Sequence, residues 1–314
     1  MSKITTNKNY CILFSTKNQY KAFEDLLFAK SAADFHDVLM INTDANSSKE
    51  ELELAEKVCD RNNIHWINKD DLMSGVPMQN CIKMADEWLT ENGVEVDWIL
   101  HFHDDCYPTI NDFWEKLDHY LEKYDEFKEK VGMFGFRVQG TKFGRGCLVQ
   151  EILENPYNGW YTHNMPSEYQ EVDYFVAEVP HWCGAGINRK LFREHVKINN
   201  NYKLNLWGDD VCYQFMMNGI YNIIFPHLHV IHDISGKKTL GVKESFEYHN
   251  LYTMDEEHKV FKDNWKFWWG VRNKNLRQEF NEAWEFYSGT IQEKLFMTSI
   301  SEGPKTIEYF ENWR

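Results

Sequence analysis

Short apolar segments alternate with amphipathic helical patterns over the first half of the chain, and this alternation constrains the fold more than any other feature. The apolar segments are predicted to be buried strands, and they lie at residues 10–14, 38–41, 65–67, 98–102 and 131–136. Strands separated by helices of this length form βαβ units with a mostly parallel sheet. The sequence therefore predicts an α/β fold with a Rossmann-like, mostly parallel central sheet flanked by helices.

Polar residues follow three of these strands directly. Ligands of parallel α/β sheets bind beyond the carboxyl ends of the strands, so these residues are candidates for a binding site. They are Ser15 and Thr16 after the first strand, Asp44 after the second, and His103, Asp104 and Asp105 after the fourth.

The Asp104–Asp105 pair is the strongest local signal for chemistry. Two adjacent carboxylates repel each other unless a cation binds between them. Their oxygen atoms suit Mg²⁺ or Mn²⁺, and either ion can also bridge the phosphates of a nucleoside diphosphate. The alternative is that both side chains cap the helix that follows, a position that Asp favours.

A second acidic pair, Asp209 and Asp210, stands where a predicted helix begins. The helix dipole favours negative charge there, which explains the pair without any function. The functional alternative is a carboxylate that deprotonates an acceptor hydroxyl.

Three histidines, His227, His229 and His232, fall within one apolar segment. In a strand, alternation puts His227 and His229 on one face and His232 on the other. We therefore expect one of them, and not all three, to reach a metal ion.

Two further segments are candidates for contact with an acceptor or a sugar. Small residues such as Gly184 and Ala185 let a ligand approach the backbone closely, although tight helix–strand packing explains them equally well. The irregular stretch over residues 139–170 is typical of a binding loop or lid, in which Lys142 and Arg145 could contact phosphate. Aromatic rings pack against the apolar faces of sugars, and the candidate rings are Trp160, Tyr161 and Trp182.

The net charge and the distribution of cysteines limit the possible binding partners and the expected cellular compartment. A net charge of −15 argues against a nucleic-acid-binding surface, since contact with phosphates needs clustered Lys and Arg. The 7 cysteines are scattered without a CxxC pair, as expected for reduced thiols in the cytoplasm. Because the sequence also lacks a signal-peptide pattern and any apolar run of about 18 residues, we predict a cytoplasmic protein without a membrane span.

Taken in order along the chain, these groups resemble the motifs of GT-A fold glycosyltransferases, particularly the inverting group typified by glycosyltransferase family 2. Those enzymes have a nucleotide-binding first strand, an acidic residue after the second, a DxD-type motif and a glycine-containing acceptor segment. An acidic pair at a helix start and a strand ending in His then follow. The stages that match here are Phe14-Ser15-Thr16, residues 42–44, 103–105, 183–186 and 208–210, and His232.

The resemblance spans about residues 9–235 and implies a division of the chain. A GT-A domain would occupy residues 1–253, with a nucleotide-binding part at about 9–137 and an acceptor part at about 138–253. A mainly helical, aromatic extension would follow over residues 254–314.

On the donor side, the resemblance implies a nucleoside-diphosphate sugar, with a UDP-sugar expected first. Asp44 would contact the base, Asp104 the ribose or the sugar, and Asp105 would be the firmest metal ligand, with His232 completing the metal site. His103 stands where the family usually has Asp. Since imidazole suits Mn²⁺ better than Mg²⁺, Mn²⁺ is the expected ion. The full set implied in donor binding is Phe14, Ser15, Thr16, Asp44, Asn80 and Asp104.

On the acceptor side, the resemblance implies that Asp210 is the catalytic base and that Asp209 orients the acceptor or the donor sugar. The acceptor would be a hydroxyl of a glycan or another molecule, and in-line attack would invert the anomeric configuration. The residues expected to contact acceptor or sugar are Trp160, Trp182, Gly184 and Ala185.

The sequence also allows two alternative hypotheses that assign the chain to a different class of protein. Residues 101–105 also fit HxHxD, part of the zinc motif of metallo-β-lactamase-like hydrolases, in which His101 and His103 share a face and hold zinc. That motif normally continues with His, where this chain has Cys106, and that hydrolase fold begins with antiparallel strands. A catalytically inactive sugar- or nucleotide-binding module is the third reading, and His103 in place of Asp is the feature that favours it.

Overall fold

The computed structural model describes residues 8–16, 18–29, 38–44, 47–67, 78–108, 112–140, 147–148, 167–202, 206–232, 254–266, 286–297 and 303–313. The strands in these ranges are β1 (Tyr10–Thr16), β2 (Met40–Asp44), β3 (Ile64–Ile67), β4 (Trp98–His103), β5 (Cys106–Pro108), β6 (Val131–Gly140), β7 (Cys147–Leu148), β8 (Phe175–Ala177), β9 (Gly184–Asn188) and β10 (Tyr221–His232). The helices are α1 (Tyr20–Ala29), α2 (Lys49–Arg61), α3 (Met78–Glu91), α4 (Phe113–Lys123), α5 (Phe127–Lys130), α6 (Arg189–His195), α7 (Trp207–Met217), α9 (Met254–Trp265), α11 (Ile291–Met297) and α12 (Ile307–Glu311), with a 3₁₀ turn η2 (Ser167–Gln170).

The strands in these ranges all belong to one sheet, whose main path runs β3-β2-β1-β4-β9-β6-β10-β5. Strands β1, β2, β3, β4, β6 and β10 point the same way, and β5, β7, β8 and β9 run against them. The predicted α/β fold with a mostly parallel sheet is confirmed. Strand β9 is the feature that periodicity did not predict, since it inserts antiparallel between β4 and β6.

Aromatic rings from neighbouring strands explain the glycines of β9. A Cβ atom on Gly186 would lie 2.0 Å from the ring of Phe134, and one on Gly184 would lie 3.3 Å from the rings of Phe102 and Phe136. These positions are glycine because the aromatic rings of the neighbouring strands occupy the space that a side chain would need.

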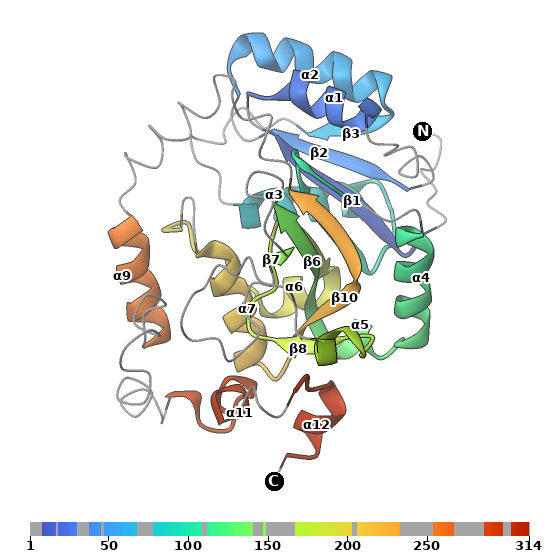
Figure 1. Ribbon diagram of the computed structural model, residues 1–314. Coiled ribbons are helices and arrows are strands. Elements are labelled where there is room, and N and C mark those ends of the chain that lie inside the picture. The colour runs from blue at the N-terminus through green and yellow to red at the C-terminus, as the bar shows by residue number, and fades with distance from the viewer. Residues whose placement is uncertain are drawn as a thin grey trace.

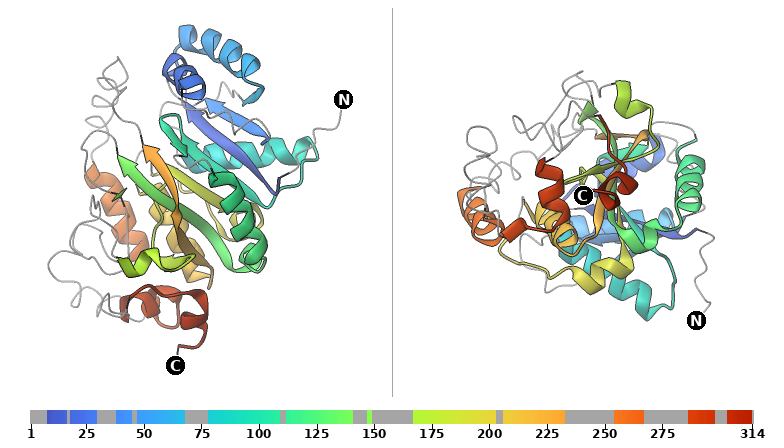
Figure 2. Two further views of the ribbon diagram at one scale, coloured as in Figure 1. Left: turned by 45° about the vertical axis from the view of Figure 1, so that its right-hand side comes forward. Right: turned by 90° about the horizontal axis from the view of Figure 1, so that it is seen from below.

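Helices cover both faces of the sheet, as a βαβ pattern requires. On one face α4 packs Phe113 against Phe136 of β6, with ring centroids 5.0 Å apart. On the other face α7 brings Cys212 to Met133 of β6, with the two sulfur atoms 3.5 Å apart. Figure 1 shows α1 and α2 together at the β3 edge, while α11 and α12 lie at the opposite end of the molecule near the C-terminus, and the left view of Figure 2 shows the same arrangement.

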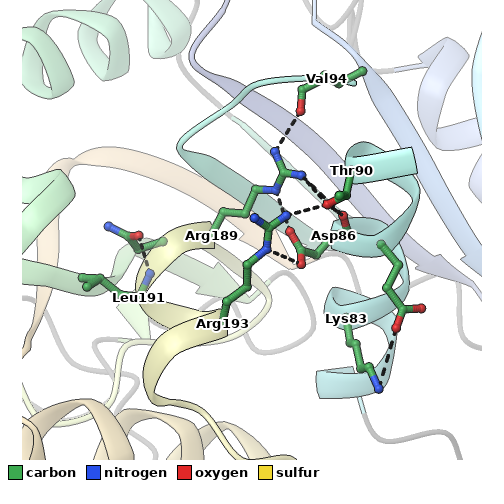
Figure 3. A network of polar contacts seen from close by, with 9 residues as sticks. Lys83, Asp86, Thr90, Val94, Arg189, Leu191 and Arg193 are labelled. Carbon is green, nitrogen blue, oxygen red and sulfur yellow. Dashed lines mark hydrogen bonds and ion pairs between the residues drawn. The ribbon is translucent and has the colours of Figure 1, made fainter. Parts of the chain in front are cut away.

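An ion-pair network centred on the buried Asp86 fixes α6, and with it the end of β9, to α3 (Figure 3). Asp86 of α3 accepts from Arg189 Nε at 2.5 Å and from Arg193 Nε at 2.7 Å. Arg189 also donates to the carbonyl of Val94 at 2.8 Å and to the hydroxyl of Thr90 at 2.9 Å. Since Arg189 directly follows β9, this network holds the carboxyl end of that strand in place.

The C-terminal segments pack on the sheet domain. The amide of Val176 donates to the carbonyl of Lys305 at 2.8 Å, and Gln292 of α11 donates to the buried carboxylate of Glu178 at 2.7 Å. The described part of residues 254–314 is mainly helical, as expected, although the predicted domain boundary itself stays a prediction. Within the described ranges, every helix is too short or too polar to cross a membrane.

Candidate functional site

Three predicted metal-site residues lie together at the carboxyl ends of the strands. His103 is the last residue of β4, Asp105 lies in the turn that follows, and His232 is the last residue of β10. Strand β5 pairs Cys106 directly with His232. As a result, Oδ1 of Asp105 lies 3.1 Å from Nε2 of His232.

The capping alternative for Asp104 and Asp105 is wrong. Both residues form a turn between β4 and β5, and α4 begins only at Phe113, with Asp112 in the capping position. The strand-end turn, not a helix end, positions the two carboxylates.

Two thiols and another imidazole join this centre, and the sequence interpretation missed all three. Sγ of Cys183 lies 3.3 Å from Nδ1 of His232 and 3.7 Å from Nε2 of His181. The ligand atoms of His103, Cys106, Cys183 and His232 all lie within 4.8 Å of one another. A hint existed in the sequence, since Cys106 stands at the position where HxHxD motifs continue with a metal-binding His.

Burial and neighbouring charges set the protonation of this centre. Burial lowers the pKa of His232, but hydrogen bonding to Asp105 and Cys183 outweighs it and raises the pKa to about 10. Burial raises the pKa of Cys106 well above its usual range. Burial opposes ionisation of Cys183 too, yet the hydrogen bond with Cys106 and the charges of His181 and His103 outweigh it and lower the pKa. The raised pKa of His232 favours its protonated form, whose positive charge offsets negative charge in the centre.

His101 faces the same side of β4 as His103, with ring centroids 5.3 Å apart, but it has a structural partner. Its Nδ1 lies 3.0 Å from the carbonyl oxygen of Trp182. Burial, reinforced by His103, lowers the pKa of His101 to about 3, so that its imidazole is neutral.

The predicted donor residues of β1 lie next to this centre. Ser15 pairs with His103 in the parallel register of β1 and β4, and its hydroxyl lies 3.1 Å from that of Thr43. Phe14 is a core residue whose ring packs 4.9 Å from that of Phe23, and buried Thr16 accepts a 2.9 Å hydrogen bond from Asn42.

Asp44 and Asn80, two further predicted donor residues, already have protein partners. Asp44 is 2 % exposed and accepts from the hydroxyl of Tyr20 and from the amide of Ser47, each at 2.8 Å. Asn80 of α3 donates to Asn200 at 3.2 Å. Their contacts with a nucleotide stay predictions.

Asp209 and Asp210 occupy the first turn of α7, where the sequence placed them. Asp210 is 3 % exposed, and its two oxygens accept from Trp265 Nε1 at 2.9 Å and Gln214 Nε2 at 2.8 Å. Burial raises the pKa of Asp210 to about 6, against the lowering effect of these hydrogen bonds. Asp209 is half-buried.

Trp182 links the α7 acidic pair to the strand-end centre. The ring centroids of Trp182 and Trp207 lie 4.3 Å apart, and a Cβ atom on Gly208 would lie 2.0 Å from Nε1 of Trp182. The next residue, Cys183, belongs to the strand-end centre. Of the other predicted acceptor residues, Gly184 and Ala185 are buried within β9, and Trp160 lies outside the described residues together with Tyr161, Lys142 and Arg145.

Comparison with solved structures identifies the fold class. A structure of GalNAc-T7 with UDP, GalNAc and Mn²⁺ aligns at 11% identity over 96% of this chain and 57% of that chain, with a TM-score of 0.53. S. aureus TarS 1–349 aligns at 12% identity over 71% and 60% of the two chains, with a TM-score of 0.47. The mannosyltransferase PcManGT from Pyrobaculum calidifontis, in complex with GDP-Man and Mn²⁺, aligns at 10% identity over 72% and 57%, with a TM-score of 0.46.

The chain has the GT-A fold, as the likeness to GalNAc-T7 shows. It spans a little over half the length of the GalNAc-T7 chain. Neither a scan against protein-family models nor a search of curated proteins finds a match. The metallo-β-lactamase-like reading is excluded by the fold, because β1, β2, β3 and β4 are mutually parallel and not antiparallel.

Proposed function

We propose that this chain is a divalent-metal-dependent glycosyltransferase that moves a sugar from a nucleoside-diphosphate sugar to a hydroxyl of a glycan or another acceptor, with inversion. The observation that carries the proposal is the approach of Asp105 Oδ1 to His232 Nε2, at 3.1 Å, beyond the carboxyl ends of β4 and β10. In an α/β sheet this is the place where ligands bind.

The residues at this centre fit a divalent ion. A carboxylate of the β4–β5 turn and an imidazole at the end of β10 converge, and His103 lies beside them, with its ring centroid 5.7 Å from that of His232. Asp105 and His232 would hold the ion, with His103 as a further nitrogen ligand that favours Mn²⁺. A bound ion of this kind supplies positive charge that offsets the charge of a leaving diphosphate.

The donor would bind along the ends of β1 and β2, within the nucleotide-binding part at about residues 9–137. The register that sets Ser15 beside His103 supports this assignment, since a diphosphate at the metal would then extend toward β1. The assigned contacts are Phe14, Ser15, Thr16, Asp44, Asn80 and Asp104. A UDP-sugar is the first donor to test, because the GalNAc-T7 structure with the same fold contains UDP and Mn²⁺.

Asp210 would accept the proton of the acceptor hydroxyl as that oxygen attacks the anomeric carbon. A carboxyl group with a pKa of about 6 is largely ionised at pH 7 and can therefore act as a base. Asp209, in the same turn, would orient the acceptor, and Trp182 would pack against a sugar ring. Attack from the side opposite the diphosphate inverts the anomeric centre.

A ligand panel tests the proposal. The full chain is heated with UDP-, GDP- and other nucleotide sugars, with and without Mn²⁺, because a ligand that binds only the folded state raises the melting temperature. Donors that stabilise the chain are then incubated with saccharide acceptors, and nucleoside diphosphate release and the product anomer are measured. Stabilisation without any hydrolysis or transfer would assign an inactive binding module instead, and no stabilisation by any sugar nucleotide would refute donor binding altogether.

A further inference from the structure

The four residues His103, Cys106, Cys183 and His232 form a second, softer ligand set at the strand-end centre. They come from two cross-strand pairs. Antiparallel pairing sets Cys106 opposite His232. The register of β4 and β9 pairs Phe102 with Gly184, and it continues to His103, whose amide donates to the carbonyl of Cys183 at 3.0 Å. Each pair therefore offers one imidazole and one thiol.

The distances fit a single small ion. The four ligand atoms lie within 4.8 Å of one another, and Cys183 Sγ is 3.3 Å from His232 Nδ1. Tetrahedral Zn²⁺, at about 2.3 Å from sulfur and about 2.0 Å from nitrogen, separates its ligand atoms by roughly 3.3 to 3.8 Å. A contraction of about 1 Å at the widest pair, within reach of side-chain rotation, closes the set around an ion.

His232 is already oriented for such an ion. Its Nδ1 faces Cys183, while its Nε2 faces Oδ1 of Asp105 at 3.1 Å. A carboxylate that accepts from the distal nitrogen of a histidine ligand is the usual outer partner of a zinc-bound imidazole. Asp105 in this arrangement orients His232 and keeps Nδ1 directed toward Cys183, on the side of the proposed ion.

The chemistry of the four ligands selects the ion. Thiolate sulfur prefers Zn²⁺ to Mn²⁺, which favours oxygen ligands. Both thiols are buried and unoxidised, at 0% exposure for Cys106 and 1% for Cys183, so bulk solvent has little access to them. His103 and His232, in contrast, are only partly buried and leave an approach for the ion.

We propose that His103, Cys106, Cys183 and His232 bind one Zn²⁺ ion. The set shares His103 and His232 with the ligands assigned above to Mn²⁺, so that the two ions compete for one centre. Binding does not depend on sugar transfer. Nor would it revive the HxHxD reading, because His101 directs Nδ1 to the carbonyl of Trp182 and is not one of the four.

Metal titration of the full chain tests the assignment. The protein, stripped of metal and kept in a thiol-free reductant, is titrated with Zn²⁺ against a chromogenic chelator and with Co²⁺ followed by absorption. One equivalent of Zn²⁺ and a thiolate-to-cobalt charge-transfer band are expected. Cys106→Ala, Cys183→Ala and His232→Ala should each weaken Zn²⁺ binding by more than about 100-fold, beyond the 10- to 100-fold expected for the outer partner in Asp105→Asn.

The matched control is Cys59→Ala, a buried cysteine of α2 outside the centre, which should leave Zn²⁺ affinity and the cobalt band unchanged. Circular dichroism establishes that each variant is folded. A cobalt spectrum without a thiolate band, or Zn²⁺ affinity unchanged in both strand-end cysteine variants, would overturn the assignment. A Cys106–Cys183 disulfide that persists in reductant would overturn it as well. None of these outcomes involves a sugar nucleotide, so they leave the glycosyltransferase proposal to its own test.

Discussion

The indole Nε1 of Trp265 donates a 2.9 Å hydrogen bond to Oδ1 of Asp210, which lies 55 residues earlier in the chain. This contact joins the C-terminal helix α9 to the acidic pair of α7. It also encloses Asp210, which is 3 % exposed. A carboxylate buried in this way is costly to keep ionised, and that cost is measurable.

Replacing Asp210 with Asn should abolish transfer and stabilise the fold at neutral pH. Burial raises the pKa of Asp210 from 3.8 to about 6 in the folded state, so the folded state binds this proton more tightly than the unfolded chain does. Stability from this group is therefore present below pH 4 and is lost as the pH rises through 6. The Asn variant avoids that loss, and its free energy of unfolding at pH 7.5, measured in urea, should rise by about 1 to 3 kcal/mol.

The half-buried neighbour supplies the control for that change. Asp209→Asn should alter the free energy of unfolding by less than about 0.5 kcal/mol. A lower stability for Asp210→Asn at pH 7.5, or transfer preserved in that variant, would count against a buried base at this position.

The same hydrogen bond predicts a shift in the pH dependence of transfer. If Asp210 accepts the acceptor proton, kcat/KM should rise with pH through about 6, because only the ionised form acts as a base. The Trp265 hydrogen bond lowers the Asp210 pKa, so Trp265→Phe should move this limb to higher pH. Trp313→Phe, two residues after the end of α12, is the matched control and should leave the limb in place. A profile unmoved by Trp265→Phe would separate Asp210 from the rate-determining proton transfer.

The two adjacent aspartates of the β4–β5 turn should differ in their effect on donor binding. Asp105 approaches His232, whereas Asp104 is expected to contact only the ribose or the sugar. Asp105→Ala should remove the Mn²⁺-dependent part of donor affinity in titration calorimetry, a loss of at least about tenfold, or about 1.4 kcal/mol. Asp104→Ala should weaken binding with and without Mn²⁺ alike. Equal Mn²⁺ dependence in wild type and Asp105→Ala would remove Asp105 from the metal ligands.

The parallel strands and the polar residues at their carboxyl ends were predicted from the sequence, because both depend on local pattern. Apolar runs of strand length located β1, β2, β3, β4 and β6, and polar residues directly after them located His103 and Asp105. Strand β9 was not predicted as part of the sheet, since its glycines take their meaning from Phe134 and Phe102, which belong to other strands. A glycine-rich segment has no periodicity of its own to read.

The thiols of the strand-end centre escaped prediction for a related reason. Cys183 reaches His232 across 49 residues, and the contact depends on the registers of β4 with β9 and of β10 with β5. Those registers cannot be predicted from the spacing of the residues along the chain. The order of motifs supplied Asp105 and His232, whereas only the three-dimensional pairing supplied Cys106 and Cys183.

Substitution of Gly186 tests whether β9 has small residues for packing or for the approach of a ligand. A Cβ atom there would lie 2.0 Å from the ring of Phe134, so Gly186→Ala should destabilise the fold by about 1 to 3 kcal/mol. Combining it with Phe134→Leu, which makes room for the methyl group, should recover part of the loss in a double-mutant cycle. Additive effects of the two substitutions would show that the glycine serves something other than this ring.

Asp86 should be among the residues on which the fold depends most, although it lies outside the proposed site. Its carboxylate accepts from Arg189 and Arg193, and the side chains of Asp86 and Arg189 are only 12% and 7% exposed. Removing the carboxylate leaves the Arg189 guanidinium buried without its counter-charge, so Asp86→Ala should cost about 3 to 5 kcal/mol in urea unfolding.

An exposed ion pair between α6 and α5 provides the comparison. Lys190 and Glu129 are 54% and 58% exposed, so Glu129→Ala should cost less than about 1 kcal/mol. Asp86 lies outside the proposed site, so the Asp86 variant should lose Zn²⁺ and donor binding only in proportion to the fraction of unfolded protein. Arg189 follows β9 directly, which makes a second outcome possible. Loss of ligand binding at a temperature where circular dichroism still shows a folded protein would instead mean that the α3–α6 network positions Cys183 through β9.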